Sequence, residues 1–244
     1  MKLEFYQLTS AGDREVNEDS MEHMIADDYA LFLVADGLGG HHAGDKASRF
    51  FCQGMIKHAE IFSKLMINNP LETFSAWISA AIKEMRRLFQ DDLSADRAHT
   101  TCAILYLDKK VALTAHCGDS RVYRLNSREI VWRTRDHSVA QELFDAGMIT
   151  EQQMANHPVQ NQLTRSINVL KEHRVEIKLY PSVKKGETFI VCSDGFWSHI
   201  KPHELIQLAQ HSSTKADLAK LARLSSFRAN GKGDNISVQM IKCL

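Results

Sequence analysis

Apolar residues are concentrated in short runs along most of the chain. The runs either alternate apolar with polar side chains or are apolar throughout, and both patterns are typical of β-strands. They cover residues 3–8, 29–35, 101–107, 111–117, 121–125, 188–192 and 236–241. The pattern therefore predicts a core built mainly of β-sheet.

Between the second and third of these runs the spacing of apolar residues changes to that of helices. Two successive segments each place their apolar side chains on one helical face. The first face consists of Ala47, Phe50, Phe51, Gly54 and Met55, and the second of Phe74, Trp77, Ile78, Ala81, Met85, Leu88 and Phe89. We expect two helices that follow each other in sequence.

A further helix is predicted near the C-terminus. Thr214 is a good N-cap residue, and Asp217 three positions later can complete a capping box. The helix should bury Leu218, Leu221 and Ala222. Strands and helices thus do not alternate regularly, as a parallel doubly wound sheet would require. The order favours an α+β fold with antiparallel sheets covered by helices.

The chain of 244 residues contains only four prolines and no linker-like or repetitive segment. We therefore expect a single domain over residues 1–244, which is within the size that one core can support. Residues 136–168 are rich in turn formers and include a His-Pro pair. This segment is predicted to be an elaborated surface region and not a core element.

Charge is balanced, with 30 lysines and arginines against 30 aspartates and glutamates. A neutral molecule has no overall field that attracts nucleic acid or anionic membranes, so neither is an expected partner. Hydrophobic residues make up 44% of the chain, but no heptad repeat or long apolar patch indicates more than a monomer.

The cysteines and the N-terminus bear on the cellular compartment. The five cysteines include no C-x-x-C pair, which favours reduced, buried thiols over disulfides or a zinc site. Glu4 stands where a signal peptide would need an apolar core, and no apolar run approaches the ~18 residues of a membrane span. We expect a cytoplasmic protein.

Four aspartates next to glycine lie at the ends of predicted strands. They are Asp36 before Gly37, Asp119 after Gly118, Asp194 before Gly195 and Asp234 after Gly233. Any one such pair can be an ordinary turn. If the strand ends meet at one edge, however, the carboxylates would repel one another unless a hard cation neutralised them, and oxygen ligands suit magnesium or manganese. Zinc is less suitable because no histidine or cysteine pair has ligand spacing.

An acidic segment near the N-terminus contains Arg14, Glu18 and Asp19. Alone, it could be a solvated turn. Beside a carboxylate-metal site, the guanidinium of Arg14 would offer the bidentate charged fork that suits a phosphate.

These motifs, in this order, resemble those of the metal-dependent protein phosphatases of the PP2C (PPM) family. The resemblance extends from about residue 4 to residue 241 and is strongest to small bacterial members that consist of the catalytic domain alone. It rests on residues 14–19, 34–41, 118–123, 136–138, 157–158, 163–165, 192–195 and 233–237.

The resemblance implies a four-layer α-β-β-α sandwich of two antiparallel sheets flanked by helix pairs. It also implies two Mn²⁺ or Mg²⁺ ions in a cleft at one end. By analogy with the family, Asp36 bridges both ions, and the Gly37 carbonyl, Asp194 and Asp234 complete the protein ligands.

Other residues take outer roles in the same analogy. Glu18 and Asp19 would hold the metal ions through water, and Arg14 would bind the substrate phosphate. Asp119 would help to hold a third, weaker metal ion, and residues 136–168 would form a mobile flap beside the cleft.

The implied reaction is hydrolysis of phosphoserine and phosphothreonine in proteins. Two metal ions lower the pKa of a bridging water, which attacks phosphorus in line without a covalent intermediate. Cys117 and Cys192 are therefore not candidate nucleophiles. Leu38 stands where animal relatives have a histidine proposed as general acid, so a metal-bound water is our first candidate for that role and His41 or His42 the second.

Two further positions depart from the family pattern. Ser10 replaces an aspartate that is usual just before Gly12, which would weaken a local cap without touching a metal ligand. Asn168 and Val169 replace the usual Leu-Gly, so the exit of the flap is expected to differ in shape.

The expected substrates are phosphorylated proteins, among them a bacterial serine/threonine kinase and its targets. One alternative is a regulatory module of the same fold that binds phosphoproteins without hydrolysing them, but the intact Asp36, Asp194, Asp234 and Arg14 oppose it. A metal phosphodiesterase or nuclease is opposed by the neutral charge and by the lack of a basic stripe with interleaved aromatic residues.

Overall fold

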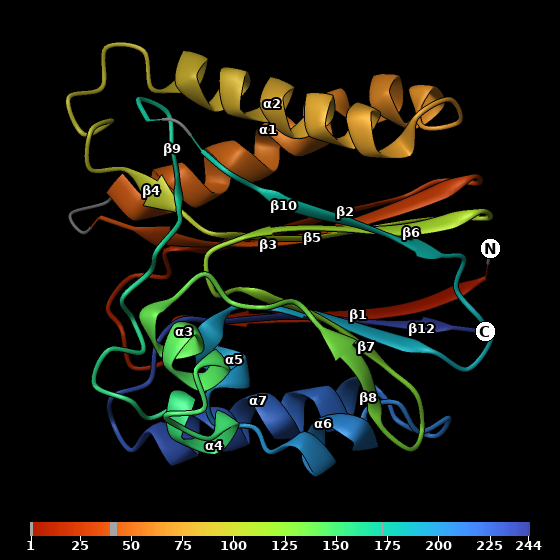
Figure 1. Ribbon diagram of the computed structural model, residues 1–244, viewed down its shortest axis with the longest axis vertical. Coiled ribbons are helices and arrows are strands. Elements are labelled where there is room, and N and C mark those ends of the chain that lie inside the picture. The colour runs from red at the N-terminus through yellow and green to blue at the C-terminus, as the bar shows by residue number, and fades with distance from the viewer. Residues whose placement is uncertain (1, 40–42, 172) are drawn as a thin grey trace.

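Two antiparallel sheets lie face to face between two layers of helices (Figure 1). The structure, a computed structural model, describes residues 2–39, 43–171 and 173–244. The outer helices on one side are α1 (Ala43–Leu65) and α2 (Pro70–Leu88). Those on the other side are α5 (Asp194–Trp197), α6 (Pro202–Gln207) and α7 (Lys215–Ala229). The four-layer α+β sandwich implied by the sequence motifs is confirmed.

The first sheet joins the two ends of the chain. Its order is β1 (Leu3–Ser10), β12 (Ile236–Cys243), β11 (Thr188–Cys192), β7 (Arg121–Leu125) and β8 (Ile130–Arg133). All neighbours are antiparallel, and the register pairs Leu3 with Cys243 and Ser10 with Ile236.

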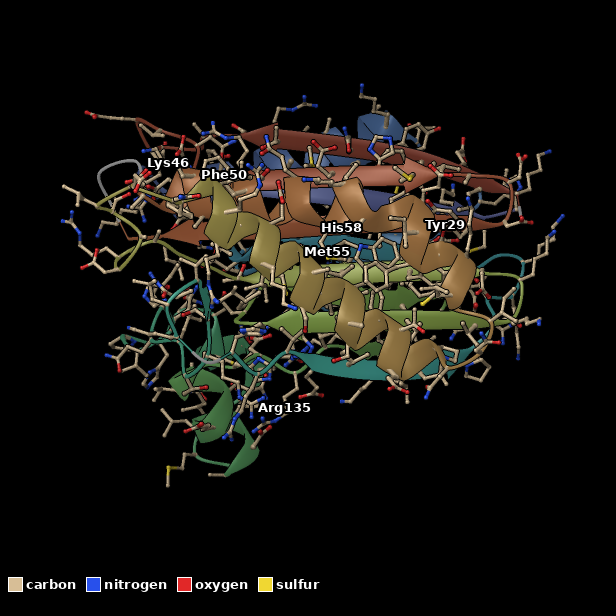
Figure 2. All side chains as sticks on the ribbon, turned by 90° about the horizontal axis from the view of Figure 1, so that it is seen from above. Tyr29, Lys46, Phe50, Met55, His58 and Arg135 are labelled. Carbon is tan, nitrogen blue, oxygen red and sulfur yellow. The ribbon has the colours of Figure 1, made fainter. Side chains whose placement is uncertain are left out.

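The second sheet carries α1 and α2 on its outer face, as Figure 2 shows. Its main strands, in order, are β10 (Glu176–Pro181), β6 (Val111–Cys117), β5 (Cys102–Asp108), β3 (Tyr29–Leu38) and β2 (Asp19–Ile25). The last two residues of β3, past the stretch that pairs with β5, pair with β4 (His99–Thr100). Strand β4 in turn pairs with β9 (Ile167–Asn168).

Every strand predicted from apolar runs is present, but five strands were missed. Two of them, β4 and β9, are only two residues long, and the other three, β2, β8 and β10, lie at a sheet edge. None of the three contains a buried residue. A half-exposed edge strand mixes polar with apolar side chains, so its sequence lacks the apolar run that marks a central strand.

Three apolar layers fill the spaces between the four structural layers. One lies between α1, α2 and the second sheet, and includes Phe51, Trp77 and Tyr106. Another, with Phe32 and Phe189, lies between the two sheets. The last lies between the first sheet and helices α5 to α7. Burial of these side chains fixes both sheets in one arrangement.

The predicted helix at the C-terminus is α7. The Thr214 side chain accepts a hydrogen bond from the backbone at the helix start, and Asp217 accepts from the backbone N–H of Thr214 at 2.8 Å. Leu218, Leu221 and Ala222 are buried, as expected.

The segment of residues 136–168 differs from the surface region that was predicted. It contains two short helices, α3 (Val139–Asp145) and α4 (Glu151–Met154), but both of its ends are core elements. Asp136 and His137 are buried at one end, and Ile167 and Asn168 at the other. Turn formers correctly marked irregular backbone, but they carry no information about the buried partners of these polar side chains.

No helix in the described part of the chain is long and apolar enough to cross a membrane. All five cysteines are free and buried.

Helices α1 and α2 approach closely at Gly54. A Cβ atom there would lie 2.6 Å from the Ala81 carbonyl oxygen and 2.9 Å from Ala81 Cα. Close by, the Trp77 indole donates to the Met55 carbonyl at 2.8 Å. Because these contacts are with backbone atoms, the helices would have to separate to admit a methyl group.

We therefore expect Gly54→Ala to destabilise the protein by about 1–3 kcal/mol, although alanine is the better helix former. Thermal unfolding would show this as a fall in Tm of roughly 2–4 °C per kcal/mol. Gln53→Ala, at an exposed position of the same helix, should change Tm little. A Gly54→Ala protein as stable as the parent would contradict this packing.

Candidate metal centre and active-site cleft

The predicted carboxylates come together in the folded chain. They line a cleft of about 750 Å³. Asp36 comes from the end of β3, and Asp119 from the turn between β6 and β7. Asp194 is the first residue of α5, and Asp234 precedes β12. Both sheets therefore contribute acidic side chains to one cavity.

The remaining predicted residues are in or beside the same cleft. Glu18, Gly37 and Arg14 line it. Asp19 is opposite Asp36 in the β2–β3 register but does not line the cleft itself. One of its carboxylate oxygens, Oδ2, accepts a hydrogen bond from Ser193 Oγ at 2.7 Å.

Backbone contacts hold the end of β3 in place. Thr101 donates its N–H to the Asp36 carbonyl at 2.8 Å, and its hydroxyl accepts the Asp36 N–H at 3.0 Å. A Cβ at Gly37 would lie 2.2 Å from the Gly44 carbonyl oxygen, so only glycine fits between β3 and the start of α1. These contacts fix the positions of the Asp36 carboxylate and the Gly37 backbone.

Asn235 organises the N-terminal segment, a role that the sequence analysis missed. Its Oδ1 accepts the Glu18 N–H at 2.8 Å, and its Nδ2 donates to the carbonyls of Ala11 and Val16 at 2.9 Å each. Its place after Gly233-Asp234 was the available signal, but its partners lie more than two hundred positions away.

The turn that carries Asp119 is also supported from a distance. Arg121 Nε donates to Asp136 at 2.7 Å, and its guanidinium lies 3.3 Å from a ring centroid of Trp197. The Trp197 indole in turn donates to the Asp119 carbonyl at 2.9 Å. This buried network connects the start of the 136–168 segment to the cleft.

Crowding changes the protonation of the carboxylates. Burial raises the pKa of Asp36 well above its usual range, and the charges of Asp19, Asp194, Asp119 and Asp234 raise it further. Burial, followed by the charge of Asp234, raises the pKa of Asp194 to about 7. Burial likewise raises the pKa of Asp19 to about 7. The cluster thus strongly favours any bound positive charge.

Two carboxylate oxygens of the cluster, Oδ1 of Asp19 and Oδ1 of Asp194, are buried without a hydrogen-bond partner. An orphaned buried oxygen is costly, and coordination of a cation is one way to satisfy it. The donors are all oxygen atoms, which is the ligand set that hard divalent cations prefer. The residues present therefore fit a magnesium or manganese centre.

Arg14 lies at the mouth of the cleft. Its guanidinium donates to Asp234 at 2.8 Å, and its side chain is 56% exposed. The exposed part of the guanidinium remains available to an anion that enters from solvent.

Two histidines, His41 and His42, were predicted as the second candidates for the general acid. His41 and His42 lie outside the described residues. The chain does bring His116, His137 and Glu176 together, with potential ligand atoms within 4.8 Å of one another. Burial lowers the pKa of His137 to about 4, so its ring is neutral. Its Nδ1 accepts the Gly118 N–H at 3.3 Å, and its Nε2 lies 3.2 Å from Nη1 of Arg165 and 3.4 Å from Oε2 of Glu176. The cluster is thus a hydrogen-bonded support for the Asp119 turn.

An acidic, oxygen-lined cleft with an arginine at its mouth is typical of hydrolases that use divalent metal ions on phosphate esters. A family model described as protein phosphatase 2C matches residues 10–229, and the chain belongs to this metal-dependent family. The resemblance found in the sequence motifs is confirmed.

The chain is also similar to individual proteins, and the two solved structures among them bear on its fold. The serine/threonine phosphatase Stp of Listeria welshimeri is 28% identical over 222 residues, which cover 88% of this chain and 85% of that protein. The crystal structure of the Mycobacterium tuberculosis serine/threonine phosphatase PstP/Ppp matches with a TM-score of 0.83 at 23% identity, covering 99% and 98% of the two chains. A structure of the PstP catalytic domain in complex with two manganese ions matches with a TM-score of 0.77 at 22% identity, covering 98% and 97%.

The raised pKa values predict how the metal-free protein responds to pH. Asp19 and Asp194 titrate near 7 when folded but near ~3.9 when unfolded, so the folded state binds more protons between these values. Stability should therefore fall as pH rises from about 4 through about 7. We expect the chelator-treated protein to have a Tm several degrees lower at pH 8 than at pH 5.5. Each kcal/mol of lost stability should lower Tm by roughly 2–4 °C in a chain of this size.

Mn²⁺ should raise Tm more at pH 8 than at pH 5.5, because protons and cations compete for the same carboxylates. Asp194→Asn should weaken the pH dependence of the metal-free protein. Equal Mn²⁺ stabilisation at both pH values would contradict the assigned site.

Proposed function

We propose that this chain is a metal-dependent protein serine/threonine phosphatase that hydrolyses phosphoserine and phosphothreonine. The observation that carries the proposal is the convergence of Asp36, Asp194 and Asp234 in one cleft, with Arg14 at its mouth, in a member of the protein phosphatase 2C family. The name of the Listeria relative, a serine/threonine phosphatase, supports the same reaction.

The proposed cofactor is a pair of Mn²⁺ or Mg²⁺ ions. Asp36, Asp194, Asp234 and the Gly37 carbonyl would hold them directly, and the all-oxygen donor set supports this choice. Such a pair supplies the activation of a water molecule for attack on phosphorus and the neutralisation of phosphate charge.

Outer positions complete the proposed centre. Glu18 lines the cleft and would act through water. Asp19, which is opposite Asp36 in the β2–β3 register, would do the same through Oδ1, which is buried without a hydrogen-bond partner. Asp119, whose charge raises the pKa of Asp36, would hold a third, more weakly bound ion together with Asp194.

The protein itself binds and orients the phosphate. Arg14 can present its charged N–H groups to the phosphate oxygens while Asp234 holds the guanidinium in place. We propose that water protonates the leaving oxygen, with His41 or His42 as the second candidate. Burial raises the pKa of the Cys117 thiol to about 12, and burial also raises the pKa of Cys192. Both thiols stay protonated, which opposes a covalent cysteine mechanism.

The cellular setting is proposed on broader grounds. Free, buried cysteines suit the reducing cytoplasm. The proposed partners are phosphorylated proteins, among them a bacterial serine/threonine kinase and its targets, and we propose that one chain of residues 1–244 acts as a single-domain monomer. A non-hydrolysing phosphoprotein-binding module is the alternative, and loss of metal ligands would favour it.

Replacement of a carboxylate by its amide tests the metal-dependent reaction. We expect Asp36→Asn and Asp194→Asn to reduce Mn²⁺-dependent hydrolysis of a phosphothreonine peptide by about a thousandfold or more, because each removes a charged ligand. The same assay without metal should give negligible turnover with the parent protein. Cys117→Ser is the control and should stay active. Metal-independent turnover, or amide variants as active as the parent, would overturn the proposal.

Arg14 tests phosphate binding separately. Arg14→Ala should lower kcat/KM for the phosphothreonine peptide by about 10–100-fold, because a bidentate charged contact to phosphate is lost. Its ion pair with Asp234 is largely exposed, so Tm should change little. Arg14→Lys should recover only part of the activity. Unchanged kinetics in Arg14→Ala would remove this residue from the site.

A further inference from the structure

A second cavity, of about 410 Å³, lies between the last turns of α2 and the residues that follow β9. Lys83, Arg86 and Arg87 of α2 line one side of it, and Val169 and Leu170 line the other. We call this cavity the basic groove. The three cations are spaced three and four positions apart, which places them on one face of the helix.

Asn168 holds the Val169–Leu170 side of the basic groove in place through hydrogen bonds of its side chain. The Asn168 Nδ2 group lies 3.1 Å from the Ala95 carbonyl and 3.0 Å from the Ala98 carbonyl, and its Oδ1 accepts the Leu170 N–H at 2.8 Å. Arg86 Nε donates to the Val169 carbonyl at 2.9 Å and closes this side against α2. Asn168 and Val169 are two of the positions that depart from the family pattern in the sequence.

Positive charge outweighs negative charge among the described residues that line the basic groove. None of the described residues that line it carries a carboxylate. Glu84, beside the groove, is already shared between Arg87 at 2.7 Å and Lys57 at 3.0 Å, and these contacts lower the pKa of Glu84 to about 2. Lys83 and Arg86 face no carboxylate within ion-pair distance among the described residues. Cations at a helix C-terminus are common because of the helix dipole. Here, however, they surround a cavity instead of projecting freely from a convex surface.

The basic groove is connected to the cleft through three paired strands. Leu38 of β3 pairs with His99 of β4, and His99 pairs with Asn168 of β9. Neighbouring strands are ~4.8 Å apart, so Asn168 lies about 10 Å from the strand that carries Asp36 and Gly37. The basic groove begins one residue further on, at Val169. An extended peptide advances ~3.3 Å per residue, so about three residues span that 10 Å, and about four to six reach from a phosphorylated residue in the cleft to the groove beyond it.

We propose that the basic groove binds an acidic segment of the phosphoprotein substrate, about four to six residues from the phosphorylated residue. The proposal rests on the phosphatase function proposed above and adds a substrate class to it. Carboxylates of the segment would pair with Lys83 and Arg86. Leu170, which is 63% exposed, offers an apolar surface for a neighbouring side chain of the segment.

Phosphothreonine peptides that differ only in charge test this directly. One peptide has three consecutive glutamates centred five residues from the phosphothreonine, and its partner has glutamines there; both are made with the run on the N-terminal and on the C-terminal side. We expect the glutamate peptide to have a KM about fivefold lower on one of the two sides, with kcat unchanged, as a few exposed charge pairs would give. The preference should fade as salt is raised from about 50 mM to about 500 mM.

Variants of the groove identify the residues responsible. Lys83→Glu combined with Arg86→Gln should abolish the preference, while glutamine can still donate to the Val169 carbonyl. Lys185→Glu, an exposed lysine in the turn after β10, makes the same charge reversal elsewhere and should keep the preference. p-Nitrophenyl phosphate, which cannot reach the groove, should be hydrolysed equally by all variants.

The outcomes separate the two proposals. Equal KM values for glutamate and glutamine peptides with the parent protein, on both sides, would overturn the groove assignment alone. A preference that survives in the Lys83→Glu, Arg86→Gln variant would overturn it as well. Failure to hydrolyse any of the phosphopeptides would instead count against the phosphatase function itself.

Discussion

Repulsion among carboxylates buried together is the constraint on which the site depends. Asp19, Asp36, Asp119 and Asp194 are largely withdrawn from water, and each raises the cost of ionising its neighbours. A protein can hold such a group only if its scaffold is fixed elsewhere and if protons or cations supply the missing positive charge. An affinity for cations and a lower stability of the metal-free cluster at high pH are both expected from the same arrangement.

The sandwich provides the necessary rigidity because each carboxylate is attached to a different central element. Asp36 extends from β3 in one sheet, whereas Asp194 and Asp234 flank β11 and β12 in the other. Packing between the two sheets therefore determines the distances within the site. Supporting contacts, such as the indole of Trp197 on the Asp119 carbonyl, connect the acidic turns to the same core. The cleft is thus a property of the whole fold, and a change in the packing of the sheets would change the site.

Much of this could be predicted from local sequence, for physical reasons that also explain what could not. Central strands are buried on both faces, so their apolar runs identify β3, β6 and β11 directly, and glycine beside aspartate identifies the turns that follow them. Edge strands such as β2 and β10 are half exposed and carry no such run. Residues that act through distant partners were missed: Ser193 contacts Asp19, and Asn235 contacts Glu18, only because the fold brings β2 and β12 together. Their roles depend on tertiary contacts that no local pattern encodes.

The departure of Asn168 from the family pattern illustrates the same limit. The sequence indicated that the chain leaves the 136–168 segment in an unusual way, but not that the asparagine side chain would hold two loops together and shape a basic groove. Residues that differ from relatives are thus informative mainly once their contacts are known.

Diffraction from crystals grown with Mn²⁺, recorded at the manganese absorption edge, tests the central claim most directly. The account predicts two strong anomalous peaks in the cleft, both beside Asp36, with Asp194 and Asp234 among their ligands. Peaks elsewhere, or a cleft in which these three side chains point away from the bound ions, would contradict it.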